Sequence, residues 1–211
     1  MTAPVHVEFV YLASQSPRRA QLLTQLGVRY ELLLADASED AEALEAVKPN
    51  EAPTAYVKRV TALKLDAAVA RMVRRDLPNA PVLCSDTTVA LGREIYGKPR
   101  SIRDAQCMLT ALSGQTHRVL TAVAAQANGK EAAAGMRHVA CCVSQVQFEA
   151  MTLAQIKAYV ATGEPMGKAG AYAVQGRAAL HITRISGSYS GIMGLPLYET
   201  AQLLRAVGLT V

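Results

Sequence analysis

Aromatic residues and long apolar runs are scarce in this 211-residue chain. It has no tryptophan and only two phenylalanines, so few rings are available on which a nucleic-acid strand could stack. No uncharged apolar stretch reaches about 18 residues, and no basic segment leads an apolar run near the start. We therefore expect no nucleic-acid partner, no membrane insertion and no export.

Cysteine is also sparse, and the four cysteines are not spaced as metal ligands are. None of the four cysteines forms a Cys-x-x-Cys pair, and none lies near a histidine array. This argues against structural zinc and predicts buried, reduced thiols in a cytoplasmic protein. The four are Cys84, Cys107, Cys141 and Cys142.

Several familiar catalytic motifs are missing. The chain has no Gly-x-x-x-x-Gly-Lys-Ser/Thr phosphate loop, and it has neither a kinase nor a dinucleotide fingerprint. No serine lies in a Gly-x-Ser-x-Gly turn, which disfavours a Ser/His/Asp hydrolase.

The composition that remains is that of a globular protein. Half of the residues are hydrophobic, enough for one sizeable core or two closely packed lobes. The net charge of +5 suits an anionic small ligand as well as nucleic acid. No internal repeat or strong boundary appears, so residues 1–211 are predicted to form a single domain.

The first motif is a strand, a serine-containing turn and a helix. Apolar residues alternate over positions 5–11, and Ser16-Pro17 is typical of a helix N-cap followed by proline at the first helical position. Arg18 and Arg19 then add charge at the end of the helix dipole that is already positive. An anion such as phosphate would remove this conflict, although two solvated arginines on a surface helix remain an alternative.

Three further residues could contribute to a site. Asp86 ends a short apolar run, where we expect a buried strand to deliver an acid to an open loop, or the acid to cap a turn. Lys64 lies near the apolar face of a long helix opened by Pro53, so it either snorkels or points into a cleft. Lys98 lies in a turn constrained by glycine and proline.

Periodicity and turn residues predict the remaining elements. His117 and His138 are expected to be strand residues with satisfied ring nitrogens rather than ligands, and Ser101 with Asp104 is expected to form a capping box. The predicted elements are strand 30–34, an acidic loop or frayed helix at 36–45, a hairpin at Gly92, a helix after Ser101, strands 116–124 and 136–148 joined at 128–129, a helix after Thr152, a polar loop at 163–176, strand 180–185 and helix 197–206.

Together these residues make up the inventory of a nucleotide hydrolase. Arg18, Arg19, Lys64 and Lys98 could bind a polyphosphate. Asp86 could hold a divalent cation or activate water. A glutamine in the polar loop, Gln175, could pair with the edge of a base.

Seven ordered motifs, running nearly end to end, resemble the Maf family of nucleoside triphosphate pyrophosphatases. They are residues 12–19 (LASQSPRR), 85–89 (SDTTV), 97–99 (GKP), 112–114 (LSG) with His117, 168–172 (KAGAY), 175–176 (QG) and 194–196 (GLP).

The resemblance implies a fold and an activity. The fold would be α/β (α+β mixed) and Maf/ITPase-like, an elongated mixed sheet flanked by helices in two lobes with a central cleft, usually as a homodimer. The activity would be cytoplasmic hydrolysis of nucleoside triphosphates between the α- and β-phosphates, with Mg²⁺ or Mn²⁺.

The resemblance also implies roles for individual residues. Asp86 would be the proton acceptor for water, and Glu39, with Asp86, would be associated with the metal. The phosphate-binding residues would be Ser14, Arg18, Arg19, Lys64 and Lys98. The branch that prefers dTTP and UTP is similar at Arg18, Thr87 and Gln175, and a glutamine amide can pair with the O4 and N3–H edge shared by uracil and thymine.

Two positions depart from the family pattern. Gly167 replaces a common acid, which affects any metal or lysine-pairing role of that acid, although Glu164 lies nearby. Ala173-Val174 replaces a usual Gly-Ile, which we expect to alter only packing. Because family members have been linked to septum formation, a regulatory nucleotide- or nucleic-acid-binding role is the alternative to the enzyme.

Overall fold

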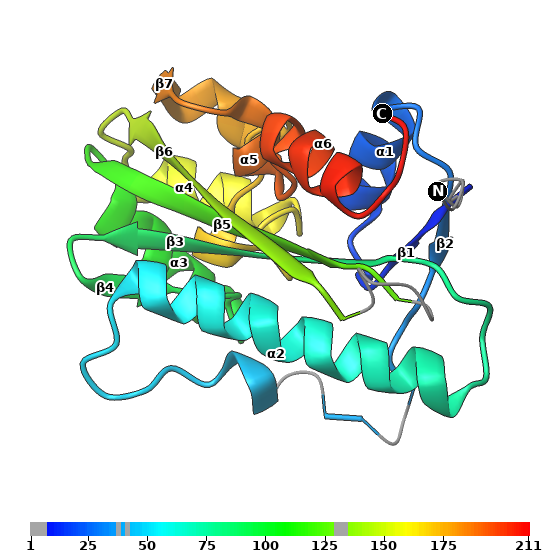
Figure 1. The fold of residues 1–211 in the computed structure, drawn as a ribbon. Coiled ribbons are helices and arrows are strands. Elements are labelled where there is room, and N and C mark those ends of the chain that lie inside the picture. The colour runs from blue at the N-terminus through cyan, green and yellow to red at the C-terminus, as the bar shows by residue number, and fades with distance from the viewer. Residues whose placement is uncertain (1–7, 37–38, 41–42, 129–134) are drawn as a thin grey trace.

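The computed structural model describes residues 8–36, 39–40, 43–128 and 135–211 as one mixed α/β fold (Figure 1). Its strands are β1 Val10–Leu12, β2 Tyr30–Leu32, β3 Val82–Leu91, β4 Glu94–Tyr96, β5 Thr116–Gln126, β6 Arg137–Phe148 and β7 Ile182–Ser186. Its helices are α1 Pro17–Gln25, α2 Pro53–Arg74, α3 Ile102–Leu112, α4 Leu153–Ala161, α5 Tyr189–Met193 and α6 Leu197–Ala206, with short 3₁₀ turns η1 Ala43–Glu45, η2 Ala169–Ala171 and η3 Arg177–His181.

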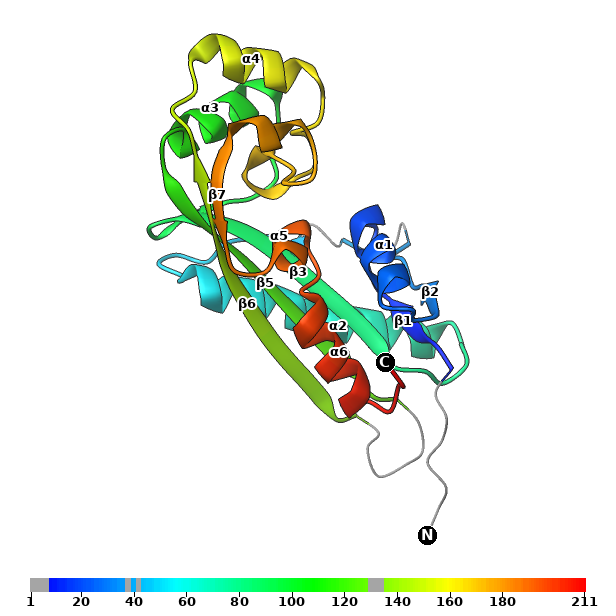
Figure 2. The ribbon, with the colours of Figure 1, turned by 90° about the horizontal axis from the view of Figure 1, so that it is seen from above.

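A seven-stranded mixed sheet forms the centre of the fold. The strand order is β2-β1-β3-β5-β6-β7, and β4 pairs with β3 off this path. β1 pairs in parallel with both β2 and β3, whereas the β3–β5, β5–β6 and β6–β7 pairs are antiparallel. The long strands make the molecule elongated, with α3 and α4 towards one end and α1, β1 and β2 towards the other (Figure 2).

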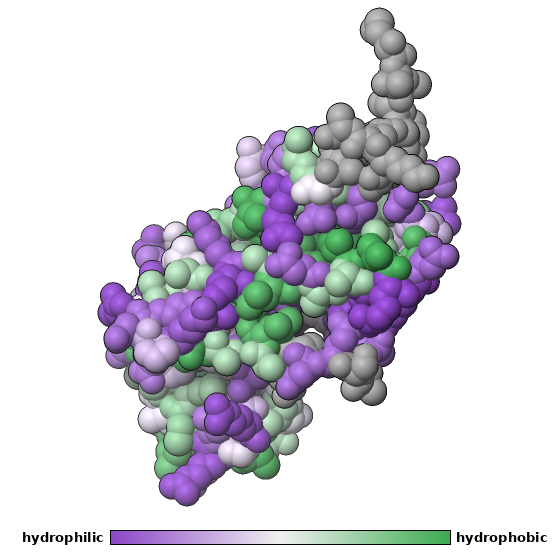
Figure 3. Space-filling model, turned by 60° about the horizontal axis from the view of Figure 1, so that its bottom comes forward, coloured by the Kyte–Doolittle hydropathy of each residue, from purple (hydrophilic) through white to green (hydrophobic). Residues whose placement is uncertain are grey.

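The two faces of the sheet are covered differently. α2 packs alone on one face, where Val57 and Val60 meet Leu120 and Ala122 of β5. A larger cluster on the other face joins apolar residues of α1, α3, α4, α5 and α6. Figure 1 shows α2 below the sheet and α1, α5 and α6 above it. On the face turned forward in Figure 3, hydrophobic patches lie among hydrophilic residues.

Local sequence signals fix most of the helix ends. Proline occupies the first turn of both α1 and α2, as expected. Gly27, at φ 72°, follows the end of α1, and Gly92, at φ 60°, makes the β3–β4 hairpin. Thr152 forms a full capping box at α4.

Two predicted caps are only partly correct. Ser16 occupies the N-cap position of α1, but its side chain makes no capping bond. Ser101 accepts a hydrogen bond from Asp104 N, whereas the Asp104 carboxylate accepts from Arg100 N instead of Ser101 N. The carboxylate thus reaches back one residue further than a capping box requires.

Other predictions need correction. Cys84 and Cys142 are buried, but Cys107 is exposed and Cys141 half-buried. His117 Nε2 lies 2.8 Å from the Tyr172 hydroxyl, yet His117 Nδ1 and His138 Nε2 are buried without a partner within the described residues. Strand 180–185 begins later, because residues up to His181 form η3.

Three expectations depend on residues outside the described ranges. These are the start of the alternating segment at residues 5–7, part of the acidic stretch at 37–38 and 41–42, and Gly129 in the predicted turn. Of the described helices, none has the length and apolar character needed to cross a membrane.

Candidate active site

A gap in the pairing of β3 creates the site. On one edge, β3 pairs with β1 at Val82 and Leu83 and with β4 from Val89 onward. Between these two contacts, residues 84–88 have no strand partner on that edge within the described chain, whereas the opposite edge pairs with β5 throughout. Asp86 lies in the middle of this gap. It was predicted at the end of a strand; it lies inside β3, and the departure of neighbouring strands opens it to the cleft.

A cleft of about 910 Å³ lies over this gap. The turn after β1 lines one wall with residues 13–19, and the loop at 167–175 lines another. Lys64 comes from α2, and Lys98 from the turn after β4. The cleft therefore collects every predicted site residue: Ser14, Arg18, Arg19, Glu39, Lys64, Asp86, Thr87, Lys98 and Gln175.

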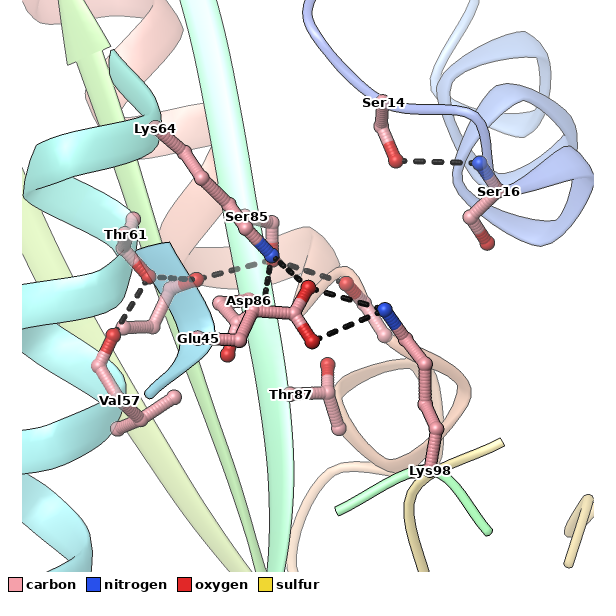
Figure 4. Close-up of polar contacts among 12 residues, drawn as sticks. Ser14, Ser16, Glu45, Val57, Thr61, Lys64, Ser85, Asp86, Thr87 and Lys98 are labelled. Carbon is pink, nitrogen blue, oxygen red and sulfur yellow. Dashed lines mark hydrogen bonds and ion pairs between the residues drawn. The ribbon is translucent and has the colours of Figure 1, made fainter. Parts of the chain in front are cut away.

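Four residues in the cleft form what we call the lysine cluster: Glu45, Lys64, Asp86 and Lys98 (Figure 4). Lys64 Nζ lies 2.6 Å from Asp86 Oδ1 and 2.7 Å from Glu45 Oε1. Lys98 Nζ lies 2.9 and 3.0 Å from the two oxygens of Glu45. Two ammonium groups are thus matched by two carboxylates, and Asp86 Oδ2 keeps no partner within the described residues.

The charges in the lysine cluster support one another. Burial lowers the pKa of Lys64, but Asp86 and Glu45 raise it by more, so the net shift is upward. Burial likewise raises the pKa of Glu45, and the nearby Lys64 and Lys98 turn the net shift downward. Lys64 is therefore an ammonium and Glu45 a carboxylate at neutral pH.

Arg19 joins three parts of the chain. Its Nε donates to Gly194 O at 2.8 Å, its Nη1 to Ser14 Oγ at 2.9 Å, and its Nη2 to Thr87 Oγ1 at 3.4 Å. Burial lowers the pKa of Arg19, while Asp86 acts in the opposite direction. Arg19 thus positions the turn containing Ser14 beside β3.

Arg18 has a different environment. No hydrogen bond to its side chain is formed within the described residues, and its buried Nε has no partner. Burial lowers its pKa, and Arg18 in turn lowers the pKa of Lys168 on the opposite wall, where burial has the larger effect. Arg18 makes no ion pair within the described residues, and a second cation, Lys168, lies across the cleft from it, an arrangement that favours an anionic ligand.

Glu39 lies in a second group of charges, which we call the arginine cluster: Asp36, Glu39, Arg71, Arg74 and Arg75. Arg71 binds both Glu39 oxygens, at 2.8 and 2.6 Å, and also donates to Leu33 O at 2.7 Å. Arg74 adds a third bond to Glu39 at 2.8 Å. Hydrogen bonds from Arg71, and then Arg74, lower the pKa of Glu39 to about 2 despite the opposing effect of burial. Both carboxylate oxygens of Glu39 are therefore bound by arginine.

Gln175 lies at the rim of the cleft, in a turn closed by a hydrogen bond from Gly176 N to Ala173 O. Its side chain is exposed and makes no hydrogen bond within the described part of the protein. The amide is thus available to a ligand.

Two carboxylates of the cleft fit a divalent cation. Glu45 and Asp86 converge on one ammonium, and two carboxylates completed by phosphate oxygens suit Mg²⁺. Within the described ranges no group of three or more His, Cys, Asp or Glu side chains could hold a metal by itself. The metal role of Glu39 stays a prediction.

Sequence reasoning did not single out Glu45 or Lys168. Glu45 was one of several acids in an unpatterned stretch, and Lys168 was noted only as a polar residue of the 163–176 loop and as part of a motif. Only the folded chain brings Glu45 next to two lysines.

This fold, and a cleft in which Asp86 and Glu45 lie among lysines and arginines, define a nucleotide-binding α/β protein. A family model described as "Maf-like protein" matches residues 9–207, and the chain belongs to the Maf family.

Relatives match over nearly their whole length. A protein of Albidiferax ferrireducens is 67% identical over 97% of this chain and 99% of its own, and one of Polaromonas sp. is 65% identical over 97% and 98%. One of Cupriavidus metallidurans is 64% identical over 95% and 97%. Each is named dTTP/UTP pyrophosphatase.

Proposed function

We propose that this protein hydrolyses dTTP and UTP to the monophosphate and pyrophosphate. The substrate and the cleaved bond are supported by the names of its close relatives. The observation in this chain that carries the proposal is Asp86, which stands in the open edge of β3 with one oxygen bound by Lys64 and the other free.

The cations of the cleft bind the triphosphate. Arg18 and Lys168 approach it from opposite walls, and Lys64 and Lys98 are ammonium donors whose present partner, Glu45, is itself an anion. Phosphate oxygens can take over these contacts when Glu45 moves aside, because lysine binds as a point charge without a fixed geometry.

Asp86 acts as the general base. Lys64 fixes Oδ1, so Oδ2 accepts a proton from the attacking water as its oxygen bonds to the α-phosphorus. The bond between that phosphorus and the bridging oxygen breaks, and pyrophosphate leaves with the electron pair. Arg18 and the lysines neutralise the charge that develops on the phosphate oxygens.

A divalent cation, Mg²⁺ or Mn²⁺, is proposed as the cofactor. Asp86 would hold it, together with Glu45 once Glu45 has left the lysines. The family resemblance also provides Glu39 as a candidate, but both of its oxygens are bound by arginine, so we expect its contribution to be small. When bound, the cation supplies Lewis-acid polarisation of the phosphates.

Gln175 reads the base. Its exposed amide at the rim of the cleft can donate to O4 and accept from N3–H, the edge that uracil and thymine share. Arg18 and Thr87 are the other proposed specificity residues; Thr87 lies 3.0 Å from Thr121 Oγ1 and contacts Arg19.

The decisive experiment offers purified protein a panel of canonical and modified triphosphates with Mg²⁺ or Mn²⁺. Pyrophosphate and orthophosphate are scored separately. We expect pyrophosphate from dTTP and UTP; orthophosphate alone would place attack at the γ-phosphorus, and neither product would favour the regulatory binding protein.

The cellular setting is also a proposal. We place the enzyme in the cytoplasm, as a homodimer that removes unwanted pyrimidine nucleotides from the pool. Val139 and Val143, both about half exposed on β6, give an apolar surface that a second copy could cover. Light scattering tests the dimer, and a monomer across the working concentration range would contradict it.

A further inference from the structure

The turn that presents Gln175 is hydrogen-bonded at both ends to a single pair of side chains. At its start, Ala173 N donates to the Tyr159 hydroxyl at 3.4 Å. Just past its end, Arg177 N and Ala178 N donate to the Glu164 carboxylate at 3.0 and 3.4 Å. The pair is closed by the Tyr159 hydroxyl, which donates to Glu164 Oε1 at 2.8 Å.

The pair itself is held on a rigid element. Tyr159 lies on α4 and is 5% exposed. Glu164 follows the end of that helix, where its backbone N donates to Thr162 Oγ1 at 3.2 Å. The Tyr159 hydroxyl both donates and accepts, so its orientation is fixed by two partners.

Glycine at position 176 lets the carboxylate approach. A Cβ built there would lie 2.4 Å from the carboxylate carbon and both oxygens of Glu164. The backbone of Gly176 has φ −104°, so this glycine is needed for space and not for conformation. Any side chain at this position would push Glu164 away from Arg177 N.

Glu164 also contacts the cation side of the cleft. Its backbone carbonyl accepts a hydrogen bond from Lys168 Nζ, and Lys168 lines the cleft opposite Arg18. Burial raises the pKa of Glu164, but bonds from Arg177 N, Tyr159 and Ala178 N lower it by more. The carboxylate is therefore ionised, which strengthens its bonds to the two backbone N–H groups.

We propose that Glu164 and Tyr159 are positioning residues for base selection: they hold the 173–178 segment so that the Gln175 amide meets the base in one orientation. The Gln175 side chain itself makes no hydrogen bond within the described chain, so its position depends on the backbone of this segment. This rests on the proposed function, because it assigns the base-reading role to Gln175. A fixed amide separates uracil from cytosine, whose edge has the opposite donor and acceptor, whereas a free amide can turn to fit either.

The test measures both binding and turnover. Non-hydrolysable α,β-imido analogues of UTP and CTP are titrated calorimetrically, and kcat and KM are measured by pyrophosphate release. The variants are Glu164→Gln, Tyr159→Phe and Gly176→Ala, which respectively remove the charge, remove the hydroxyl and displace an intact carboxylate. Glu149→Gln is the matched control, because Glu149 pairs with His181 at 2.7 Å and makes no bond to the 173–178 segment.

We expect the UTP-to-CTP preference to fall about tenfold in all three variants, mainly through a weaker affinity and a higher KM for UTP. The kcat for UTP should stay within about threefold, because Asp86 and the lysines are unchanged. Glu149→Gln should keep the wild-type preference. In a Gln175→Ala background, Glu164→Gln should change the preference no further, since its effect acts through Gln175.

An unchanged binding preference in Glu164→Gln and Tyr159→Phe, even with a lowered melting temperature, overturns the proposal. So does an undiminished effect of Glu164→Gln in the Gln175→Ala background. If the wild-type protein releases no pyrophosphate, the proposed function fails, while the binding titrations still decide the role of the pair.

Discussion

The arginine cluster and the lysine cluster lie on the same cleft and differ in how their charges are paired. In the arginine cluster, Glu39 accepts three bonds and Arg71 is only 6% exposed. In the lysine cluster, Glu45 is shared by two ammonium groups, and Lys98 is about half exposed.

The difference in pairing suits the arginine cluster to a structural role and the lysine cluster to ligand binding. A guanidinium that binds both oxygens of one carboxylate fixes the geometry of both groups. An ammonium cannot bind two oxygens in a fixed plane in this way, so it can change partners more easily. A site that exchanges a carboxylate for phosphate requires such a change. The arginine cluster therefore secures the loop after β2 to α2, whereas under the proposed function the lysine cluster exchanges Glu45 for a ligand.

The largest expected effect is at Asp86. Asp86→Asn should lower kcat by about 10²–10⁴-fold, because the amide cannot accept the proton from water. Affinity for the imido analogue of UTP should change by only a few fold. Asp66→Asn is the control, since Asp66 pairs with Arg137 at the surface of α2. Near-normal turnover in Asp86→Asn would remove Asp86 from the chemistry.

The two lysines should differ in degree. Lys64→Gln should lower kcat/KM by about 100-fold, because it removes a phosphate-binding charge and the cation that fixes Asp86. Lys98→Gln should cost about tenfold, since Lys98 is half exposed and contacts only Glu45 in this cluster. Steady-state kinetics with UTP measures both, and equal losses would show that the contact with Asp86 is unimportant.

Glu39→Gln should affect stability and not activity. Loss of the charged bonds to Arg71 and Arg74 should lower the free energy of unfolding by about 1–3 kcal/mol, measured by urea denaturation. Turnover, and its dependence on Mg²⁺ concentration, should stay within about twofold. A tenfold shift in the Mg²⁺ dependence would instead support a metal-binding role for Glu39. The arginine cluster would then not be purely structural.

The smallest effect is a pH dependence. The folded-state pKa of Glu39 is lowered to about 2 from an ordinary 4.5, so its stabilisation is complete above the unfolded value and is lost as pH falls towards 2. The stability difference between wild type and Glu39→Gln should shrink between about pH 4.5 and pH 2. Denaturation series across this range measure it, and a constant difference would mean that Glu39 is not bound as an ion.

Local signals predicted the helices well. Pro53 correctly predicts the start of α2, and helix 197–206 was predicted with the bounds that α6 has. These elements depend on capping and periodicity, which the sequence displays directly.

The site was harder to predict from residues alone. Asp86 was recognised as a candidate, but its access to solvent depends on where β1 leaves β3 and where β4 joins it, which are contacts between distant segments. Glu45 belongs to an acidic stretch without periodicity, and its partners come from α2 and from the turn after β4. Local sequence patterns do not show which distant segments pair with one another, so they could not predict these contacts.

The continuous course of β3 limits how the protein can move. β3 joins β1 at one end, β4 at the other and β5 along nine registered positions. A hinge in β3 at Asp86 would break those hydrogen bonds, so β3 is a rigid base for the cleft. Any closure of the cleft would therefore have to come from its walls, while Asp86, the proposed proton acceptor, keeps its place in β3.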